Sequence, residues 1–250
     1  MVNGSGRPRR GVVAVAAGCG AVILLATAGW LWSQSGRVQS ATPWQSALPG
    51  QVSTLGSGDV QGVDSLADPA WVAQTASATG IPSRALASYA GATLAVAKTH
   101  PDCGLSWTTL AAIGYVESEH GTIYGGKIDS DGVARPQVVG VALNGAGVAG
   151  IADTDGGEVD GDPQWDRAVG PMQFIPSTWE SYAQDGDLDQ MADIHDLDDA
   201  ALAAAVYLCQ VGGDLTVASN WIAAVSAYNV SVEYNNRVVA AADHYASLAD

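Results

Sequence analysis

An uncharged run near the start of the chain constrains its organisation most. Residues 11–32 contain no charged side chain, and the run is long enough to cross a bilayer as a helix. Arg7, Arg9 and Arg10 precede it, and basic residues beside a span stay on the cytoplasmic side. We therefore expect residues 1–10 to form a cytoplasmic tail and residues 11–32 a single transmembrane anchor, with the remainder of the chain outside the cytoplasm.

Two other interpretations of this run place the remainder in the same compartment. A cleaved signal peptide would release it as a secreted protein, but the apolar run is longer than a usual signal core, which favours the anchor. Lipid attachment at Cys19 is the weaker interpretation, because the apolar run continues well past that cysteine.

Charge is distributed unevenly along the chain. All 26 acidic residues lie at Asp59 or beyond, where only six basic residues accompany them. Such a strongly acidic region repels the phosphates of nucleic acids. Nucleic-acid binding is therefore excluded as a function, although acidity alone selects no substrate.

The pattern beyond the anchor predicts a flexible linker followed by one mainly α domain. Residues 33–66 are rich in Ser, Gly, Gln and Pro and lack a helical period, which is typical of a stalk. Asp68 and Pro69 have the residue types of a helix start, as does Ser106. Residues 121–168 are rich in Gly and Asp without a clear period, so we expect a long loop-rich insertion in a domain of residues 67–250. We expect a first helix from Pro69 up to the break at Gly80, a second that Ser83 caps and Pro101 ends, and a third from Ser106 to Glu117. Further helices are expected at residues 177–182, 198–209, 216–227 and 231–248.

Cys103 and Cys209 are the two cysteines of this domain. An exported domain with two cysteines favours one disulfide. The alternative is a pair of buried free thiols packed as small apolar residues.

Glu117 is the first candidate for catalysis. It ends an apolar helical segment, Leu110 to Val116, so we expect it to be partly buried. Burial raises the pKa of a carboxyl group, and an acid that stays protonated near neutral pH can protonate a glycosidic oxygen. Many helices end in a solvated glutamate, so this position alone is weak support.

Two further segments offer groups suited to sugars. Gln173 lies between Met172 and Phe174 in a segment whose prolines and glycine fix the backbone at a helix start. Tyr228 and Asn229 end another helix and could hydrogen-bond an acetamido sugar. The alternatives are a packed loop–helix junction and an ordinary C-cap.

Together these segments resemble the lytic transglycosylase family, in its membrane-bound murein transglycosylase B branch. The resemblance covers roughly residues 68–245, and the runs at 151–155 and 165–169 resemble actinobacterial members. It rests on the order and spacing of four motifs: Glu117-Ser-Glu-His-Gly121, Gly170-Pro-Met-Gln-Phe-Ile-Pro-Ser-Thr-Trp179, Asp199-Ala-Ala-Leu-Ala-Ala-Ala-Val-Tyr-Leu208 and Ala227-Tyr-Asn229.

The resemblance implies a lysozyme-like fold and a lyase of peptidoglycan glycan strands. Glu117 would protonate the leaving oxygen and then take the proton of the muramic acid C6 hydroxyl, leaving a 1,6-anhydro end. The substrate-binding residues implied are Gln173, Met172, Phe174, Tyr228, Asn229 and Tyr234. This reaction requires no cofactor, and the sequence identifies no protein partner.

Two alternatives remain open beside the lyase. A lysozyme-type hydrolase needs a second carboxylate, which Asp153, Asp155 or Glu158 could supply. A non-catalytic cell-wall glycan-binding protein would use the same scaffold without the chemistry.

An acidic segment predicts a structural calcium site as one of two interpretations. Asp185, Asp187, Asp189 and Asp196 occupy positions 1, 3, 5 and 12 of a calcium-loop register, and some members of the family carry such a loop here. Gln190 stands where the register expects glycine, and Asp196 is shorter than the usual glutamate. The other interpretation is a solvated acidic loop that ends in a helix cap.

Overall fold

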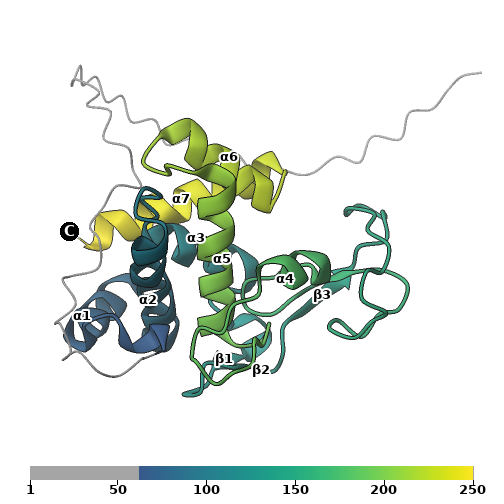
Figure 1. Ribbon diagram of the computed structural model, residues 1–250, viewed down its shortest axis with the longest axis horizontal. Coiled ribbons are helices and arrows are strands. Elements are labelled where there is room, and N and C mark those ends of the chain that lie inside the picture. Colours follow the sequence, from purple (N-terminus) through teal and green to yellow (C-terminus); the bar gives the residue numbers. More distant parts are fainter. Residues whose placement is uncertain (1–61, 250) are drawn as a thin grey trace, which may run out of the picture. The chain divides into compact units, whose positions relative to one another are not determined.

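The computed structural model describes residues 62–249 (Figure 1). The expected tail, the anchor of residues 11–32 and most of the linker lie outside the described residues. No helix formed by residues 62–249 is long and apolar enough to cross a membrane.

The described chain is mainly helical, as the sequence predicts. The helices are α1 (Pro69–Thr79), α2 (Ser83–Thr99), α3 (Trp107–Ser118), α4 (Pro176–Tyr182), α5 (Leu197–Gly212), α6 (Ala218–Tyr228) and α7 (Val232–Ala249). Asp68 caps α1 by accepting from the backbone N–H groups of Ala70 and Trp71, and Ser106 caps α3. Ser83, expected as a cap, is instead the first residue of α2.

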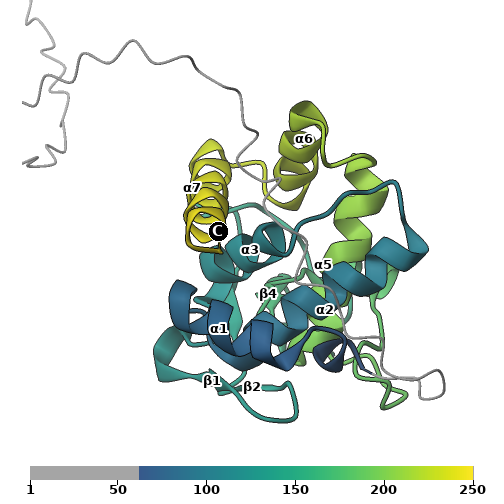
Figure 2. The ribbon, with the colours of Figure 1, turned by 90° about the vertical axis from the view of Figure 1, so that its left-hand side faces the viewer.

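Helix α3 forms the centre of the domain. Every residue from Trp107 to Gly114 is buried, because α3 packs against α2, α5 and α7 (Figures 1 and 2). The last turn emerges from this core and carries Glu117. A buried helix whose end reaches the surface can hold one side chain rigidly at the border between core and solvent.

A partly buried ion pair joins α2 to α5, which lie side by side. Arg84 pairs with Asp198, whose carboxylate also accepts a hydrogen bond of 2.7 Å from the Ser88 hydroxyl. Since Asp198 is fully buried, the pair and the hydroxyl supply the contacts that the carboxylate loses on leaving water. Cys103 and Cys209 form a disulfide between the loop before α3 and helix α5, as predicted.

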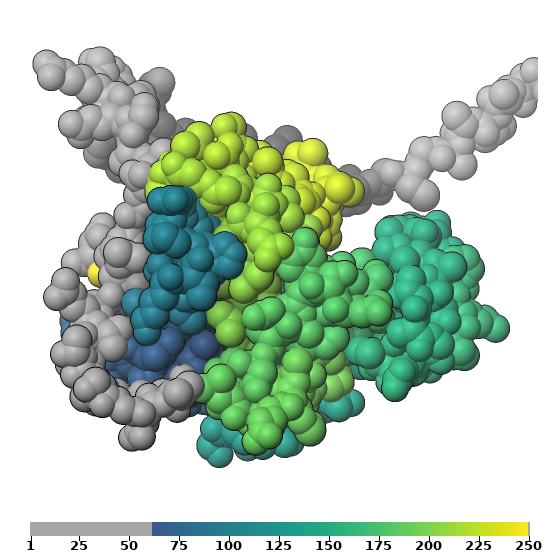
Figure 3. All heavy atoms as spheres, in the orientation of Figure 1, coloured from purple at the N-terminus to yellow at the C-terminus, as the bar shows by residue number. Residues whose placement is uncertain are grey.

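The insertion contains short strands that the sequence pattern does not reveal. Strand β1 (Lys127–Ile128) pairs with β2 (Ala134–Arg135), and β3 (Val139–Ala142) pairs with β4 (Arg167–Val169), both antiparallel. Strands of two to four residues are too short to show an alternating pattern. Residues 143–166 between β3 and β4 project from the helical body (Figure 3).

The folded region begins within the segment expected to be the end of the linker. Val63–Ser65 form a short 3-10 helix, η1, which packs against α2. The Val63 backbone N–H donates to the Gly186 carbonyl at 2.8 Å, and the Val63 side chain is buried. These contacts place residues 63–65 on the domain. A second 3-10 helix, η2 (Ile123–Gly125), follows α3.

Candidate active site

A cleft of about 720 Å³ opens beside the end of α3. One wall consists of residues between Leu143 and Ile151 of the insertion, and the opposite wall of residues 227–231 after α6. Residues 173–178, at the start of α4, line the space between the walls. Figure 3 shows this hollow between the teal insertion and the yellow-green end of α6. Its volume is in the range of sites that bind small ligands.

Glu117 contributes the carboxyl group of this cleft. It sits in the last turn of α3, and burial raises the pKa of its carboxyl to about 7. Charge on this group is disfavoured because apolar surroundings solvate a carboxylate poorly. The carboxyl can therefore hold or release a proton near neutral pH, as a group that acts first as acid and then as base must do.

Two groups on α7 oppose this effect of burial. The Tyr234 hydroxyl faces the Glu117 carboxyl and lowers its pKa, although the two groups fall short of the geometry of a full hydrogen bond. The positive charge of Arg237 also lowers the pKa of Glu117. Tyr234 is buried behind the carboxyl and does not line the cleft. The structure thus places Tyr234 beside Glu117 rather than along the cleft wall.

A hydrogen bond connects the end of α3 to the segment before α4. The Ser118 hydroxyl donates to the Pro171 carbonyl at 2.6 Å and accepts from the Gly121 backbone N–H at 2.8 Å. On either side of Pro171 the chain turns through Gly170 and Gln173, both with positive φ, of 79° and 51°. This turn brings Gln173 to the cleft that contains Glu117, although 56 positions separate them in the numbering.

Gln173 and Met172 were both expected to contact substrate, but the Gln173 amide is hydrogen-bonded within the turn and the Met172 side chain is buried. The Gln173 amide nitrogen donates to the Gly170 carbonyl at 2.9 Å, so it fastens the turn, while the residue also lines the cleft. The Met172 side chain is fully buried in the core. Only its backbone lies near the cleft residues, because the Met172 carbonyl accepts a 2.8 Å hydrogen bond from the Tyr228 hydroxyl.

Aromatic side chains form the floor between the two walls. The ring of Phe174 contacts that of Tyr228 with centroids 5.7 Å apart, and the ring of Tyr207 contacts Tyr228 at the same centroid distance. All three line the cleft, as does Asn229, the C-cap of α6. Tyr207 was not singled out from the sequence, because its position within an apolar helix gives no signal of exposure. Aromatic faces beside amide groups suit the binding of sugar rings.

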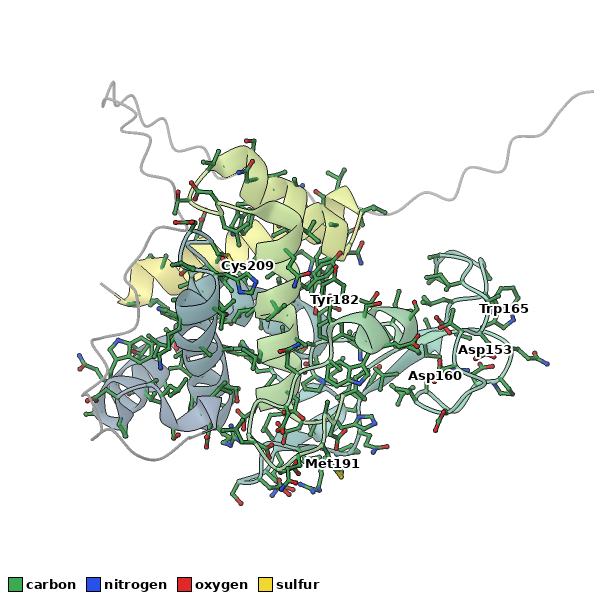
Figure 4. The ribbon with its side chains drawn as sticks, in the orientation of Figure 1. Asp153, Asp160, Trp165, Tyr182, Met191 and Cys209 are labelled. Carbon is green, nitrogen blue, oxygen red and sulfur yellow. A yellow bond between two sulfur atoms is a disulfide. The ribbon has the colours of Figure 1, made fainter. Side chains whose placement is uncertain are left out.

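Glu117 is the only carboxyl group that lines this cleft among the described residues. Asp153, Asp155 and Glu158 lie in the projecting part of the insertion, where Figure 4 labels Asp153, Asp160 and Trp165. Asp153 and Asp155 lie close to the buried Asp166 there. One carboxylate oxygen from each of the three residues lies within 4.8 Å of the other two. None of the three residues suggested for a second carboxylate borders the cleft.

The acidic loop before α5 brings together a different set of carboxylates from the calcium-loop register. Asp185 and Asp187 lie with Asp199, and their ligand atoms are within 4.8 Å of one another. Asp196 instead caps α5 by accepting from backbone N–H groups, and Asp189 accepts from the Met191 backbone N–H at 2.8 Å. Met191 marks the loop in Figure 4.

The carboxylates of Asp185 and Asp187 in this loop and of Asp199 in α5 fit a hard cation in part. One Asp185 oxygen is buried without a hydrogen-bond partner, and burial raises the pKa of Asp199 to about 6. Both observations are expected of carboxylates that a cation would stabilise. Asp189 and Asp196 are held by backbone contacts and would have to turn to join them.

Residues 158–235 match the family model of the transglycosylase SLT domain. The match covers about a third of the chain, including Gln173, Tyr228, Asn229 and Tyr234, and it does not reach Glu117. No curated protein and no solved structure matches the chain. The match supports a lytic transglycosylase acting on peptidoglycan, and the mainly helical structure fits a lysozyme-like fold.

Proposed function

We propose that the domain is a lytic transglycosylase that cleaves the β-1,4 bond between muramic acid and glucosamine residues, with Glu117 as its catalytic residue. The observation that carries this proposal is a single cleft carboxyl whose pKa burial raises to about 7. The match of residues 158–235 to the transglycosylase domain supports the substrate class.

In the proposed reaction one carboxyl group acts twice. Protonated Glu117 donates its proton to the glycosidic oxygen as the bond to C1 breaks, which leaves Glu117 ionised. The ionised carboxylate then accepts the proton of the C6 hydroxyl while the hydroxyl oxygen bonds to C1. The product carries a 1,6-anhydro end, no water is consumed, and Glu117 returns to its protonated form.

The two other candidates agree less well with the cleft. Glycoside hydrolases of the usual kind place two carboxyl groups on opposite sides of the bond that is cleaved. In the described part of the chain the cleft offers one. A purely binding protein has no need of a carboxyl group whose pKa lies near neutrality, and shifts of this kind are concentrated in functional sites.

The finer assignments rest on the sequence. We place the domain in the murein transglycosylase B branch, in its actinobacterial form, because of the order of its motifs. We also propose that residues 11–32 anchor it in the cell membrane with the domain on the cell-wall side.

A calcium ion, where bound, would be held by Asp185, Asp187 and Asp199 and would brace the loop before α5 without taking part in the reaction. Adding calcium to chelator-treated protein should then raise its melting temperature, and an unchanged temperature would remove this assignment.

The test of the proposed function is digestion of purified peptidoglycan by the wild type and by Glu117→Gln. Glutamine keeps the size of the side chain and cannot exchange a proton, so digestion should fall at least about a thousandfold, as expected when the only acid and base is lost. The control is Glu180→Gln on the exposed side of α4, which should digest as the wild type does. Equal activity of Glu117→Gln and the wild type would refute the assignment of Glu117.

A further inference from the structure

A second pocket, of about 760 Å³, lies on the other side of the end of α3. Its walls come from the end of α1, from Tyr115 in α3 and the turn that follows this helix, and from α7; α7 packs against both α1 and α3 (Figure 2). Glu117 faces the catalytic cleft, whereas Tyr115 and Glu119 line this pocket. The two sites therefore share the last turn of one helix.

Two charged side chains line the second pocket and are not paired with each other. Of the six basic residues in the described part of the chain, Arg84, Lys127, Arg135 and Arg167 are in ion pairs. The two basic residues of this part without an ion pair are Arg237 and Lys98. Arg237 lines the pocket, whereas Lys98 is exposed elsewhere on the surface. Glu119 also lines the pocket, and within residues 62–249 its carboxylate has neither an ion pair nor a side-chain hydrogen bond. The pocket thus offers one positive and one negative group in an otherwise acidic domain.

The backbone holds Glu119 in an unfavourable conformation. Glu119 has a φ of 53° and His120 a φ of 62°. Both values lie in the left-handed region, which residues other than glycine rarely adopt. His120 is fixed there because its ring lies between the hydroxyls of Tyr89 and Tyr245, at 3.3 Å and 2.9 Å. Such conformations persist where surrounding contacts enforce them and are concentrated at functional sites. The contacts of His120 thus hold the backbone turn that follows α3, and Glu119, the C-cap of α3, lines the pocket at this turn.

The chemistry of the two sites is complementary. The catalytic cleft is lined by apolar, aromatic, amide and hydroxyl groups and by Glu117, but by no basic side chain, so it offers no positive charge to a carboxylate. The second pocket offers a guanidinium, a carboxylate and the rings of Tyr115 and Tyr245. A ligand with both a carboxylate and an ammonium group would satisfy the two charges, since guanidinium groups bind carboxylates well.

We propose that the second pocket binds the uncrosslinked stem peptide of peptidoglycan, with Arg237 on a carboxylate and Glu119 on the ammonium group of its diamino acid. The proposal rests on the proposed function, because this peptide is attached to the sugar beside the bond that Glu117 would cleave. Glu117 and Glu119 are two positions apart, which places their backbones at most about 7 Å from each other, and five extended residues reach about 17 Å. A stem peptide is therefore longer than the separation of the two backbone positions that border the cleft and the pocket.

The first experiment compares kcat/KM on strands that carry stem peptides with kcat/KM on strands from which an amidase has removed them. The wild type should favour the peptide-bearing strands, and Arg237→Gln should lower kcat/KM about tenfold more on these than on the stripped strands, as expected for one charge-assisted hydrogen bond. Arg237 also affects the pKa of Glu117, and this effect applies to both substrates, so the ratio of the two values isolates the pocket. Lys98→Gln, which removes the other basic residue without an ion pair, should keep the wild-type ratio. An equal loss on both substrates would overturn the proposal.

The second experiment tests the pocket without catalysis. Titration of the wild type with a free stem tetrapeptide, followed by calorimetry, should show binding that Arg237→Gln weakens about tenfold. Acetylation of the amino group of the diamino acid alone should weaken binding to the wild type and leave binding to Glu119→Gln unchanged. If the wild type cleaves neither kind of strand, the proposed function fails while this titration still decides the pocket. No binding of the tetrapeptide would overturn the inference.

Discussion

Replacing Glu117 with glutamine should stabilise the protein above neutral pH while it removes activity. In the folded protein Glu117 has a pKa of about 7, against 4.5 in the unfolded chain. Between these values the unfolded chain binds fewer protons at this position, so the free energy of unfolding of the wild type falls as pH rises from 4.5 to 7. The glutamine side chain of the variant would resemble the protonated acid at every pH and would not titrate.

The size of the effect follows from the two pKa values. Each pKa unit corresponds to about 1.4 kcal/mol, so the advantage of Glu117→Gln should rise from near zero at about pH 4 to about 3 kcal/mol at about pH 8. At higher pH the advantage should stay constant, because the group is ionised in both states.

The assay is denaturant unfolding of both proteins at pH 4, 6 and 8, followed by fluorescence. The control Glu180→Gln removes an exposed carboxyl and should follow the wild type at every pH. A difference between Glu117→Gln and the wild type that does not change with pH would refute the argument from burial.

Three further perturbations test other parts of the account. The activity of the wild type should fall as pH rises above about 7, because Glu117 must be protonated to act as the acid; a rate that stays level to about pH 9 would contradict this. Replacing both Cys103 and Cys209 with alanine should lower the free energy of unfolding by about 2–4 kcal/mol, since the disulfide closes a long loop, and denaturant unfolding measures the loss. Gly170→Ala should cost about 3 kcal/mol or more, because Gly170 has a φ of 79° and a methyl group there would collide with the Ile194 carbonyl; an unchanged melting temperature would show that the turn is not fixed as described.

The helices were predictable because their starts and their apolar periods are local features. Asp68 and Ser106 cap α1 and α3 as their residue types indicate, and the ends of α5 to α7 fall within three residues of those expected. The order of the motifs also led to Glu117, Gln173 and Tyr228 as one set, and the structure brings these three to one cleft.

The surroundings of individual side chains were not predictable, because they depend on contacts between distant segments. Met172 is buried and Gln173 is not, a difference set by the turn at Gly170 and by the Tyr228 hydroxyl on the Met172 carbonyl. Asp199 joins the acidic cluster in place of Asp196, because Asp196 accepts hydrogen bonds at the start of α5. The second pocket has no sequence signal at all, since Glu119 and Arg237 meet there only through the packing of α3 and α7.

The most direct test of the central claim is the source of the oxygen at the new glycan end. Peptidoglycan would be digested in water labelled with heavy oxygen, and the fragments analysed by mass spectrometry. The proposed reaction uses the C6 hydroxyl of the substrate, so the fragments should lack one water, carry 1,6-anhydro ends and contain no label. Reducing ends that carry the label would show that water is the nucleophile and would contradict the role of Glu117 as acid and then base in a lytic transglycosylase.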